Sequence, residues 1–387
     1  MLTKLTSLFM TVIMFIFPYL NIPEAKVDKS EMKTNYTCVF VHGLCGWGGY
    51  NLTNNVAPYW GMFGGDLTKY LNARGFDTYA ATVNQNSSAW DRACELYAQL
   101  TGTRVDYGKE HSQRCGHARY GRDFSCMPLI KKFDSENKIN LIGHSFGGTT
   151  ALMFIDLMAD GSEKERAVTP KDELSPLFEG GKGDYIYSLT TLASPMNGTT
   201  AIEVKTEVEN DPNATLSEKA VVGLMSVIAY TKHDGRDKKD TAGYDLSIDA
   251  CTEMMKETET RNDIYYFSVP TCATETVNGV TTPKAELIEA VYAPAAYRMA
   301  SYTGITEGGV VLDESWQPND GLVNVKSSIA PFNAPQQALD KNNIQPGIWN
   351  ILPTETGDHM SLMGGMTINK NIRPLITDLL LTINKLG

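Results

Sequence analysis

The feature that most constrains the fold is a Gly-x-Ser-x-Gly sequence, residues 143–147, placed between an apolar run and a helix-like stretch. Residues 139–142 are typical of a short buried strand, and residues 148–158 lack proline and are rich in large apolar side chains. A sharp turn from strand to helix strains its middle residue and needs glycine two positions before and after it. This context predicts that Ser145 is a nucleophile, rather than a chance match in a glycine-rich chain.

Short apolar segments recur between helix-like stretches. They cover residues 36–42, 76–82, 138–144, 186–193, 264–269 and 347–352. This alternation predicts an α/β fold in which a mostly parallel sheet carries helices on both faces. A last amphipathic helix, from Ile372 to Leu386, is expected to cover the sheet. Residues 84–128 and 197–260 are too long and polar to be simple connections, so we expect insertions on the functional face.

The N-terminus is typical of an exported protein. Residues 5–23 carry no charge and follow Lys4, which matches a secretory signal, while Pro18 and the short apolar length argue against a spanning anchor. We therefore predict a signal peptide at 1–25 with cleavage near Ala25, a spacer at 26–35, a single domain at 36–387 and no stable membrane anchor. The net charge of -11 favours solubility and excludes nucleic acid as a partner.

Seven cysteines are an odd number for an exported chain, so at least one must be free or paired with another chain. Their spacing matches no zinc-cysteine motif. Cys115 with Cys126 and Cys251 with Cys272 are possible bridges, but sequence alone does not give the pairing.

A serine nucleophile needs a histidine base, and the chain has only six histidines. After a strand–turn–helix nucleophile the expected order is serine, then a carboxylate, then histidine, which leaves His233 and His359. His233 lies in a charged stretch typical of a solvated loop, whereas His359 follows the apolar segment 347–352. We therefore predict that His359 is the base.

The carboxylate must lie between the serine and this histidine. Asp320 is favoured because it sits in a turn after a strand-like segment, with Asp313 and Asp340 remaining as alternatives. The adjacent Asp358 is a poor partner because neighbouring side chains point apart. The glycine-rich loop at 41–49 supplies backbone near the nucleophile, and the amides of Leu44 and Phe146 are predicted to form an oxyanion hole.

Several longer stretches of the chain are distinctive. They are WDRACELYAQL (90–100), VDYG (105–108), GHARYG (116–121), SPLFEGG (175–181), DTAGYDLS (240–247) and NDGLVN (319–324). With these stretches the chain, from about residue 36 to 386, resembles the bacterial zinc-containing lipases, the thermoalkalophilic and staphylococcal-type branch of the α/β-hydrolases. The resemblance implies an α/β-hydrolase fold with a zinc-stapled insertion and a helical lid.

The resemblance also implies one structural zinc per chain, held by Asp91, His111, His117 and Asp240. Two imidazoles and two carboxylates suit a closed tetrahedral site with no position for water. Such a site would join the first insertion to the second.

The chain departs from the family in two places. Where the calcium-binding branch has carboxylates after the catalytic histidine, this chain has Ser361 and Met366, so calcium binding is doubtful. The lid region between Pro195 and Asp240 is shorter than usual. It still contains one apolar helix face, which suits either a lid or a core helix: Leu216, Ala220, Val221, Leu224, Met225 and Ile228.

Together these features predict a secreted carboxylic ester hydrolase, a lipase or esterase acting on acylglycerols or other apolar esters. The alternative is a short-lid esterase or polyester hydrolase with little true lipase activity. A zinc-activated water is a rival mechanism, although four protein ligands argue against it. A silent binding protein is a further rival, and the intact catalytic set argues against that.

Overall fold

The structure is a computed structural model that describes residues 27–216, 218–219, 237–364 and 371–387. The predicted signal peptide, His233 and Met366 lie outside these residues, as do five of the six residues of the predicted lid face. Within the described residues, no helix combines the length and the apolar character that a membrane span requires.

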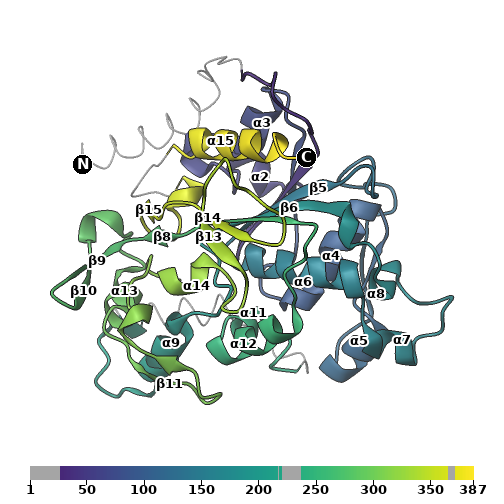
Figure 1. Ribbon diagram of the computed structural model, residues 1–387. Helices are drawn as coiled ribbons and strands as arrows, with labels where there is room; N and C mark the ends of the chain where they lie inside the picture. Colours follow the sequence, from purple (N-terminus) through teal and green to yellow (C-terminus); the bar gives the residue numbers. More distant parts are fainter. Residues whose placement is uncertain (1–26, 217, 220–236, 365–370) are drawn as a thin grey trace, which may run out of the picture.

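A parallel sheet forms the centre of the molecule (Figure 1). The described residues build seven strands in the order β13-β14-β7-β6-β5-β1-β2, and neighbouring strands are parallel throughout. In sequence order they are β1 (Thr37–Val41), β2 (Thr78–Ala81), β5 (Ile139–His144), β6 (Ile186–Leu192), β7 (Tyr265–Val269), β13 (Gln336–Ala338) and β14 (Trp349–Ile351). The six predicted strands are confirmed, and β13 is an edge strand that the sequence patterns missed.

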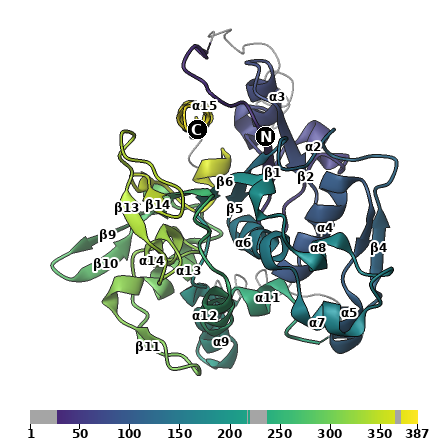
Figure 2. The same cartoon turned by 45° about the vertical axis from the view of Figure 1, so that its right-hand side comes forward.

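The two faces of the sheet are both buried. In β1, Val39 and Val41 enter one core while Cys38 and Phe40 enter the other, because successive side chains point to opposite faces. The first core packs against α4 (Ala89–Thr101) and α6 (Phe146–Asp160). The second packs against α3 (Leu67–Asn72) and α15 (Arg373–Asn384). Figures 1 and 2 show these helices on opposite sides of the sheet. The predicted C-terminal helix is therefore confirmed as sheet cladding.

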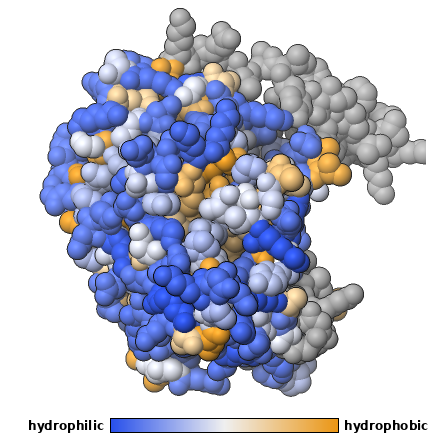
Figure 3. Space-filling model, turned by 90° about the vertical axis from the view of Figure 1, so that its right-hand side faces the viewer, coloured by the Kyte–Doolittle hydropathy of each residue, from blue (hydrophilic) through white to orange (hydrophobic). Residues whose placement is uncertain are grey.

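The first long connection contains α4, β3 (Arg104–Asp106), α5 (Lys109–Cys115) and β4 (Tyr120–Asp123), where β3 and β4 pair antiparallel. The second contains α9 (Thr200–Asn210), α11 (Ala242–Asp245) and α12 (Ile248–Glu257). Between α6 and β6 lie α7 (Glu163–Val168), α8 (Pro176–Glu179) and the 3-10 turn η3 (Gly183–Tyr185). The face that carries α5 and α7 at the right of Figure 1 is mostly hydrophilic, with small scattered apolar patches (Figure 3).

Small elements complete the fold. Near the N-terminal end are α2 (Thr53–Val56) and η2 (Met62–Gly64). Strand pairs β9 (Thr274–Val277) with β10 (Val280–Pro283), and β11 (Gly304–Ile305) with β12 (Val311–Leu312), are antiparallel hairpins. β8 (Thr271–Cys272) pairs in parallel with β15 (Glu355–Thr356). The remaining helices are η4 (Ala285–Leu287), α13 (Ala293–Met299), η5 (Glu314–Trp316), α14 (Val325–Ile329) and η6 (Ser361–Met363).

All seven cysteines lie among the described residues, and neither considered disulfide is present in the structure. The Cys251 thiol instead donates to the Asp245 carbonyl oxygen at 2.9 Å.

Candidate functional site

Ser145 occupies the sharp turn between β5 and α6. Its φ of 54° lies in the left-handed region that residues other than glycine rarely adopt. A Cβ on Gly143 would lie 2.5 Å from the Gly148 amide nitrogen, and one on Gly147 would lie 2.1 Å from the Val41 carbonyl oxygen. The predicted reason for both glycines is thus confirmed: the backbone passes too close for any side chain.

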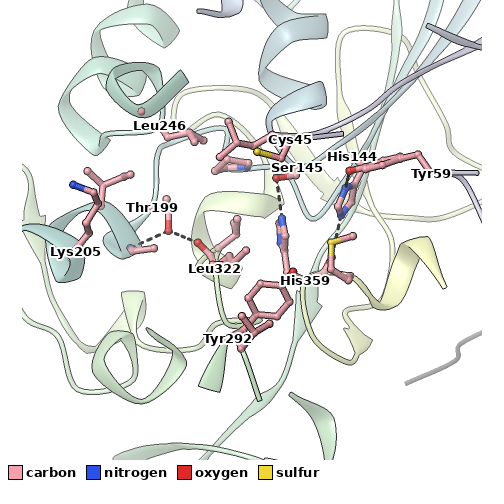
Figure 4. Close-up of a pocket in the computed structure, with 18 of the residues that line it drawn as sticks. Cys45, Tyr59, His144, Ser145, Thr199, Lys205, Leu246, Tyr292, Leu322 and His359 are labelled. Carbon is pink, nitrogen blue, oxygen red and sulfur yellow. Dashed lines mark hydrogen bonds between the residues drawn. The ribbon is translucent and has the colours of Figure 1, made fainter. Parts of the chain in front are cut away.

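His359 lies between Ser145 and Asp320. Its Nε2 is 2.8 Å from the Ser145 Oγ, and its Nδ1 is 2.9 Å from Asp320 Oδ2. Figure 4 shows the imidazole pointing at the serine. His359 follows β15, whose pairing with β8 fixes the loop, and its amide donates to the Asp320 carbonyl oxygen at 2.9 Å. The three residues meet although they lie far apart in sequence.

Asp320 is fully buried and keeps its charge. Oδ2 also accepts from the Thr271 hydroxyl at 2.6 Å, and Oδ1 accepts from the amides of Leu322 and Val323 at 3.1 and 2.8 Å. Burial alone would raise the pKa of Asp320, but the neighbouring His359 and these hydrogen bonds outweigh burial and hold it below its usual value. An ionised Asp320 fixes the His359 tautomer with the proton on Nδ1.

The other carboxylates considered lie elsewhere. Asp313 caps the surface turn η5, where it accepts from the Ser315 amide at 3.0 Å, and the exposed Asp340 accepts from the Asn342 amide. Asp358 is buried and accepts from the Glu289 amide and from the Ser361 hydroxyl, at 3.0 and 2.9 Å. Each therefore holds a turn, and Asp320 alone of the four bonds to His359.

The two predicted oxyanion donors border the serine. Phe146 begins α6, and Leu44 lines the same cavity as Ser145. Among the described residues, neither backbone amide has a hydrogen-bond acceptor, so both are available to a substrate oxygen. The loop that carries Leu44 is fixed on both sides of it. The Gly43 amide donates to the Tyr59 hydroxyl at 3.0 Å, and the Cys45 amide donates to the Gln85 carbonyl oxygen at 3.1 Å.

A buried arginine fixes the same loop, and no sequence pattern predicted this role. The Arg92 guanidinium donates to the carbonyl oxygens of His42 and Asn84 and to the Thr150 hydroxyl, and it lies over the Phe146 ring. Burial lowers the pKa of Arg92 to about 10, so it remains charged at neutral pH. Arg92 therefore connects α4 to both segments that carry the oxyanion amides.

Ser145 and His359 open into a cavity of about 320 Å³ with mostly apolar walls. These walls include Leu44, Trp47, Ile202, Leu246, Val291 and Met360. Such a volume is within the range of small-ligand sites, and the few polar groups at its floor would fix the orientation of a ligand.

Most of the predicted lid face lies outside the described residues. α9 lines the cavity through Ala201, Ile202 and Lys205. Of the predicted lid face, Leu216 is the described member and is 87% exposed.

A second cluster joins the two long connections. Asp91 lies in the first turn of α4, His111 in α5, His117 just after α5, and Asp240 two residues before α11. His111 Nε2 lies 3.2 Å from Asp91 Oδ1 and 3.3 Å from Asp240 Oδ1. His117 Nε2 lies 3.3 Å from Asp240 Oδ2 and 3.8 Å from Asp91 Oδ1. The four predicted ligands thus converge, although the sequence separates them by up to about 150 residues.

Four buried atoms at the centre of this cluster have no hydrogen-bond partner. They are Asp91 Oδ1, His111 Nε2, His117 Nε2 and Asp240 Oδ2. Unpaired buried polar atoms are costly and indicate a missing ligand. Tetrahedral bonds of about 2.0–2.1 Å place ligand atoms about 3.3–3.4 Å apart, close to the separations observed. The donor set therefore fits a zinc ion.

Cys115 is an alternative fourth ligand, because its Sγ also belongs to a group within 4.8 Å formed with His111, His117 and Asp240. However, Cys115 Sγ lies 3.8 Å from His111 Nδ1, the ring nitrogen that does not face the carboxylates. Asp91 Oδ1 instead faces Nε2 of the same ring. The geometry therefore favours Asp91 as the fourth ligand.

Neighbouring groups hold the cluster in place. The buried Glu165 accepts from the amides of Glu110 and His111, at 3.0 and 2.7 Å, and so caps the start of α5. The Ser88 hydroxyl donates to Asp240 Oδ1 at 2.6 Å. Trp90 stacks on the His111 ring with centroids 5.0 Å apart. None of these partners had a local sequence signal, because each belongs to a different part of the chain from the residue it holds.

In this cluster the carboxylates and the histidines shift each other's pKa values. Burial lowers the pKa of His111, but the Asp240 and Asp91 carboxylates outweigh burial and raise it to about 11. Burial raises the pKa of Asp240, but the two histidines outweigh it and lower it. Two carboxylates thus call for two positive charges, which two protons or one divalent cation would supply.

The fold and the Ser145–His359–Asp320 arrangement define the class as an α/β-hydrolase with a serine at its nucleophile turn. A family model described as "Lipase-like, C-terminal domain" matches residues 34–212 and 224–375. The chain therefore belongs to the staphylococcal-type bacterial lipase family. It is 30% identical over 403 residues to a lipase of Staphylococcus hyicus, covering 94% of this chain. It spans 60% of that relative's length.

Solved structures agree with this assignment. The fold is similar to that of EstA from Clostridium botulinum, with a TM-score of 0.78 and 32% identity, covering 95% of this chain and 91% of that one. It is also similar to lipase 1 from Pelosinus fermentans, with a TM-score of 0.72 and 34% identity, covering 91% and 99% of the two chains. The predicted α/β-hydrolase fold is therefore confirmed.

Proposed function

We propose that this chain is a carboxylic ester hydrolase in which Ser145 is the nucleophile, His359 the general base and Asp320 the residue that orients the base. The observation that carries the proposal is the unbroken line from Ser145 Oγ through both ring nitrogens of His359 to Asp320, at 2.8 and 2.9 Å. This line opens into an apolar cavity. Distances of this size allow proton transfer without rearrangement.

The reaction follows from these positions. The Ser145 oxygen bonds to the ester carbonyl carbon while its proton passes to His359 Nε2. The carbonyl oxygen becomes an oxyanion, which the amides of Leu44 and Phe146 stabilise. The carbon–oxygen bond to the alcohol then breaks, and His359 returns the proton to the departing alcohol. Water repeats the sequence on the acyl-enzyme, which releases the carboxylic acid and restores Ser145.

We infer that the acyl part of the substrate is apolar, because the cavity walls are mostly apolar. Acylglycerols are the first expectation, in line with the lipases that this chain resembles. Short-chain esters or aliphatic polyesters are the alternative. A rate profile across nitrophenyl esters and emulsified triacylglycerols of increasing chain length, below and above their solubility limits, distinguishes them.

We also infer one structural zinc per chain at Asp91, His111, His117 and Asp240. Zinc supplies a tight cross-link between segments with little core of their own. Four protein ligands leave no position for a reacting water, which favours the serine route over a metal-activated water. Metal analysis of the purified chain should find about one zinc per chain.

We further propose export, with residues 1–25 as the signal peptide and cleavage near Ala25. N-terminal sequencing of secreted protein tests this.

The test of the reaction is Ser145→Ala, measured on a nitrophenyl ester. Turnover should fall by more than about a thousandfold, because the acyl-enzyme cannot form. Ser188→Ala is a matched control, since Ser188 is also buried but bonds to Asn140 in the sheet. Near-normal turnover by Ser145→Ala would remove Ser145 from the mechanism.

A further inference from the structure

A chain of buried hydrogen bonds runs from the oxyanion loop to the backbone of His359. The Gly43 amide donates to the Tyr59 Oη at 3.0 Å, and this Oη lies 2.7 Å from His144 Nδ1. The other nitrogen of that ring, Nε2, lies 2.9 Å from the His359 carbonyl oxygen. Figure 4 shows Tyr59 and His144 next to each other, to the right of the serine.

The direction of each bond follows from its donors. Because the Gly43 amide can only donate, the Tyr59 oxygen accepts from it and directs its own proton toward His144 Nδ1. Burial, and next the charge of His359, lower the pKa of His144 to about 3, so the ring is neutral and has one proton. With Nδ1 accepting, that proton is on Nε2, where it donates to the His359 carbonyl oxygen. The hydroxyl of Tyr59 therefore fixes the His144 tautomer.

We propose that Tyr59 and His144 are positioning residues for the ester hydrolysis proposed above, because together they couple the oxyanion loop to the backbone of the base. His144 directly precedes the nucleophile in the chain, and Gly43 directly precedes Leu44, one of the oxyanion donors. The hydrogen-bonded chain thus joins the oxyanion loop to the base, and the peptide bond after His144 joins it to the serine.

Little solvent reaches the side chains of the network, so a lost bond is not readily replaced. Tyr59, His144 and His359 are 3%, 1% and 3% exposed. Removing the Tyr59 hydroxyl leaves the Gly43 amide and His144 Nδ1 unpaired, and buried unpaired groups are costly. The site relieves that cost by moving the loop, or by placing the His144 proton on Nδ1, which turns a lone pair toward the His359 carbonyl oxygen. Either change displaces reacting groups, and a shift of about 1 Å can slow a reaction about a hundredfold.

The primary experiment compares Tyr59→Phe with Tyr266→Phe. Tyr266 is 1% exposed and its hydroxyl also accepts from a backbone amide, that of Arg261 at 3.1 Å, but it does not line the cavity. Both variants thus lose a buried bond from a backbone amide, and Tyr59→Phe also loses the bond to His144. We expect Tyr59→Phe to lower kcat about 10- to 100-fold with KM within about threefold, while Tyr266→Phe keeps the wild-type kcat. Equal kcat values in folded samples of the two variants would overturn the proposal.

A double-mutant cycle tests whether Tyr59 acts through His144. In a His144→Leu background, Tyr59→Phe should lower kcat by less than it does in the wild type, because the bond to His144 is already absent and only the bond from the Gly43 amide remains to be broken. His144→Gln should retain more kcat than His144→Leu, since an amide can both accept and donate. Fully additive losses would contradict the coupling. Ser145→Ala in the same series separates the two proposals: if it remains active the hydrolase mechanism fails, and if it alone is inactive only this network fails.

Discussion

The two clusters of histidine and carboxylate in this molecule differ in how their polar atoms are satisfied. In the Ser145–His359–Asp320 line, each side-chain oxygen and ring nitrogen has a hydrogen-bond partner. In the cluster of Asp91, His111, His117 and Asp240, one atom of each residue is buried without one. The first cluster is complete without an added group, whereas a cation would complete the second. Proximity of histidine and carboxylate alone would not have separated these two kinds of site.

The two clusters also differ in the pKa values of their buried histidines. Near the serine, burial lowers the pKa of His42 and of His144 to about 3, so both rings are neutral donors and acceptors. At the other cluster, carboxylates outweigh burial and raise the pKa of His111 to about 11. Buried histidines therefore serve as neutral supports in one region and as partners of negative charge in the other.

The largest effect should come from breaking the complete cluster while leaving the other intact. Asp320→Asn removes the charge that fixes the His359 tautomer, so kcat should fall by about a thousandfold to ten-thousandfold. Zinc content should stay the same. Asp313→Asn is the control, because Asp313 is an exposed turn residue. Comparable losses in both variants would show that Asp320 has no special role.

Removing the proposed zinc ion should lower the stability of the chain, whereas Asp320→Asn should lower kcat. Dialysis against a chelator leaves two carboxylates facing each other across a buried site, so the free energy of unfolding should fall by several kcal/mol. Thermal unfolding with and without chelator measures this. Zinc should restore stability and magnesium should not, because magnesium prefers oxygen ligands in octahedral geometry. An unchanged melting temperature after complete zinc removal would refute a structural role.

Arg92 tests whether the clusters are independent, because it follows the proposed ligand Asp91 on α4 and bonds to the oxyanion loop. Arg92→Met leaves the His42 and Asn84 carbonyl oxygens without this donor, so stability should fall by about 3 kcal/mol. Turnover should fall as well. Arg122→Met is the control, since Arg122 is exposed and its guanidinium lies over the rings of Tyr50 and Phe124. Chemical denaturation and ester turnover measure the two effects, and a stable, fully active Arg92→Met would contradict the connection.

The sequence predicted most of the fold because its strands are short continuous apolar runs between glycine and polar segments. It missed β13 at the sheet edge, where Gln336 and Ala338 are exposed and Gln337 is half-buried. An edge strand needs no apolar run, since one side of it has no neighbouring strand. The nucleophile turn was predictable for a different reason: it requires glycines at fixed spacing within five residues.

The supports of the site were not predictable in this way. Ser145, Asp320 and His359 follow a known chain order, but Tyr59, Glu165 and Thr271 act through one or two hydrogen bonds to distant segments. Such bonds leave no periodicity or spacing in the sequence. The four proposed metal ligands came from family resemblance, and only the fold brings their unpaired atoms together.

The smallest expected effect concerns the neutral histidines. The pKa of His42 is about 3 in the folded chain because of burial and then the Arg92 charge, against about 6.5 when unfolded. Its contribution to stability is complete above pH 6.5 and is lost as the pH falls from there toward 3, because only the unfolded chain takes up the proton. His42→Gln should therefore flatten the pH dependence of the unfolding free energy by up to about 1.4 kcal/mol per pH unit below 6.5. Urea unfolding at pH 8, 6 and 5 measures this free energy.

The comparison with wild type is essential, because burial also raises the pKa of Glu95 to about 7. Glu95 therefore changes the unfolding free energy with pH in the opposite direction, and it does so in both proteins. Parallel profiles from pH 8 to 5 would show that His42 is not a buried neutral ring.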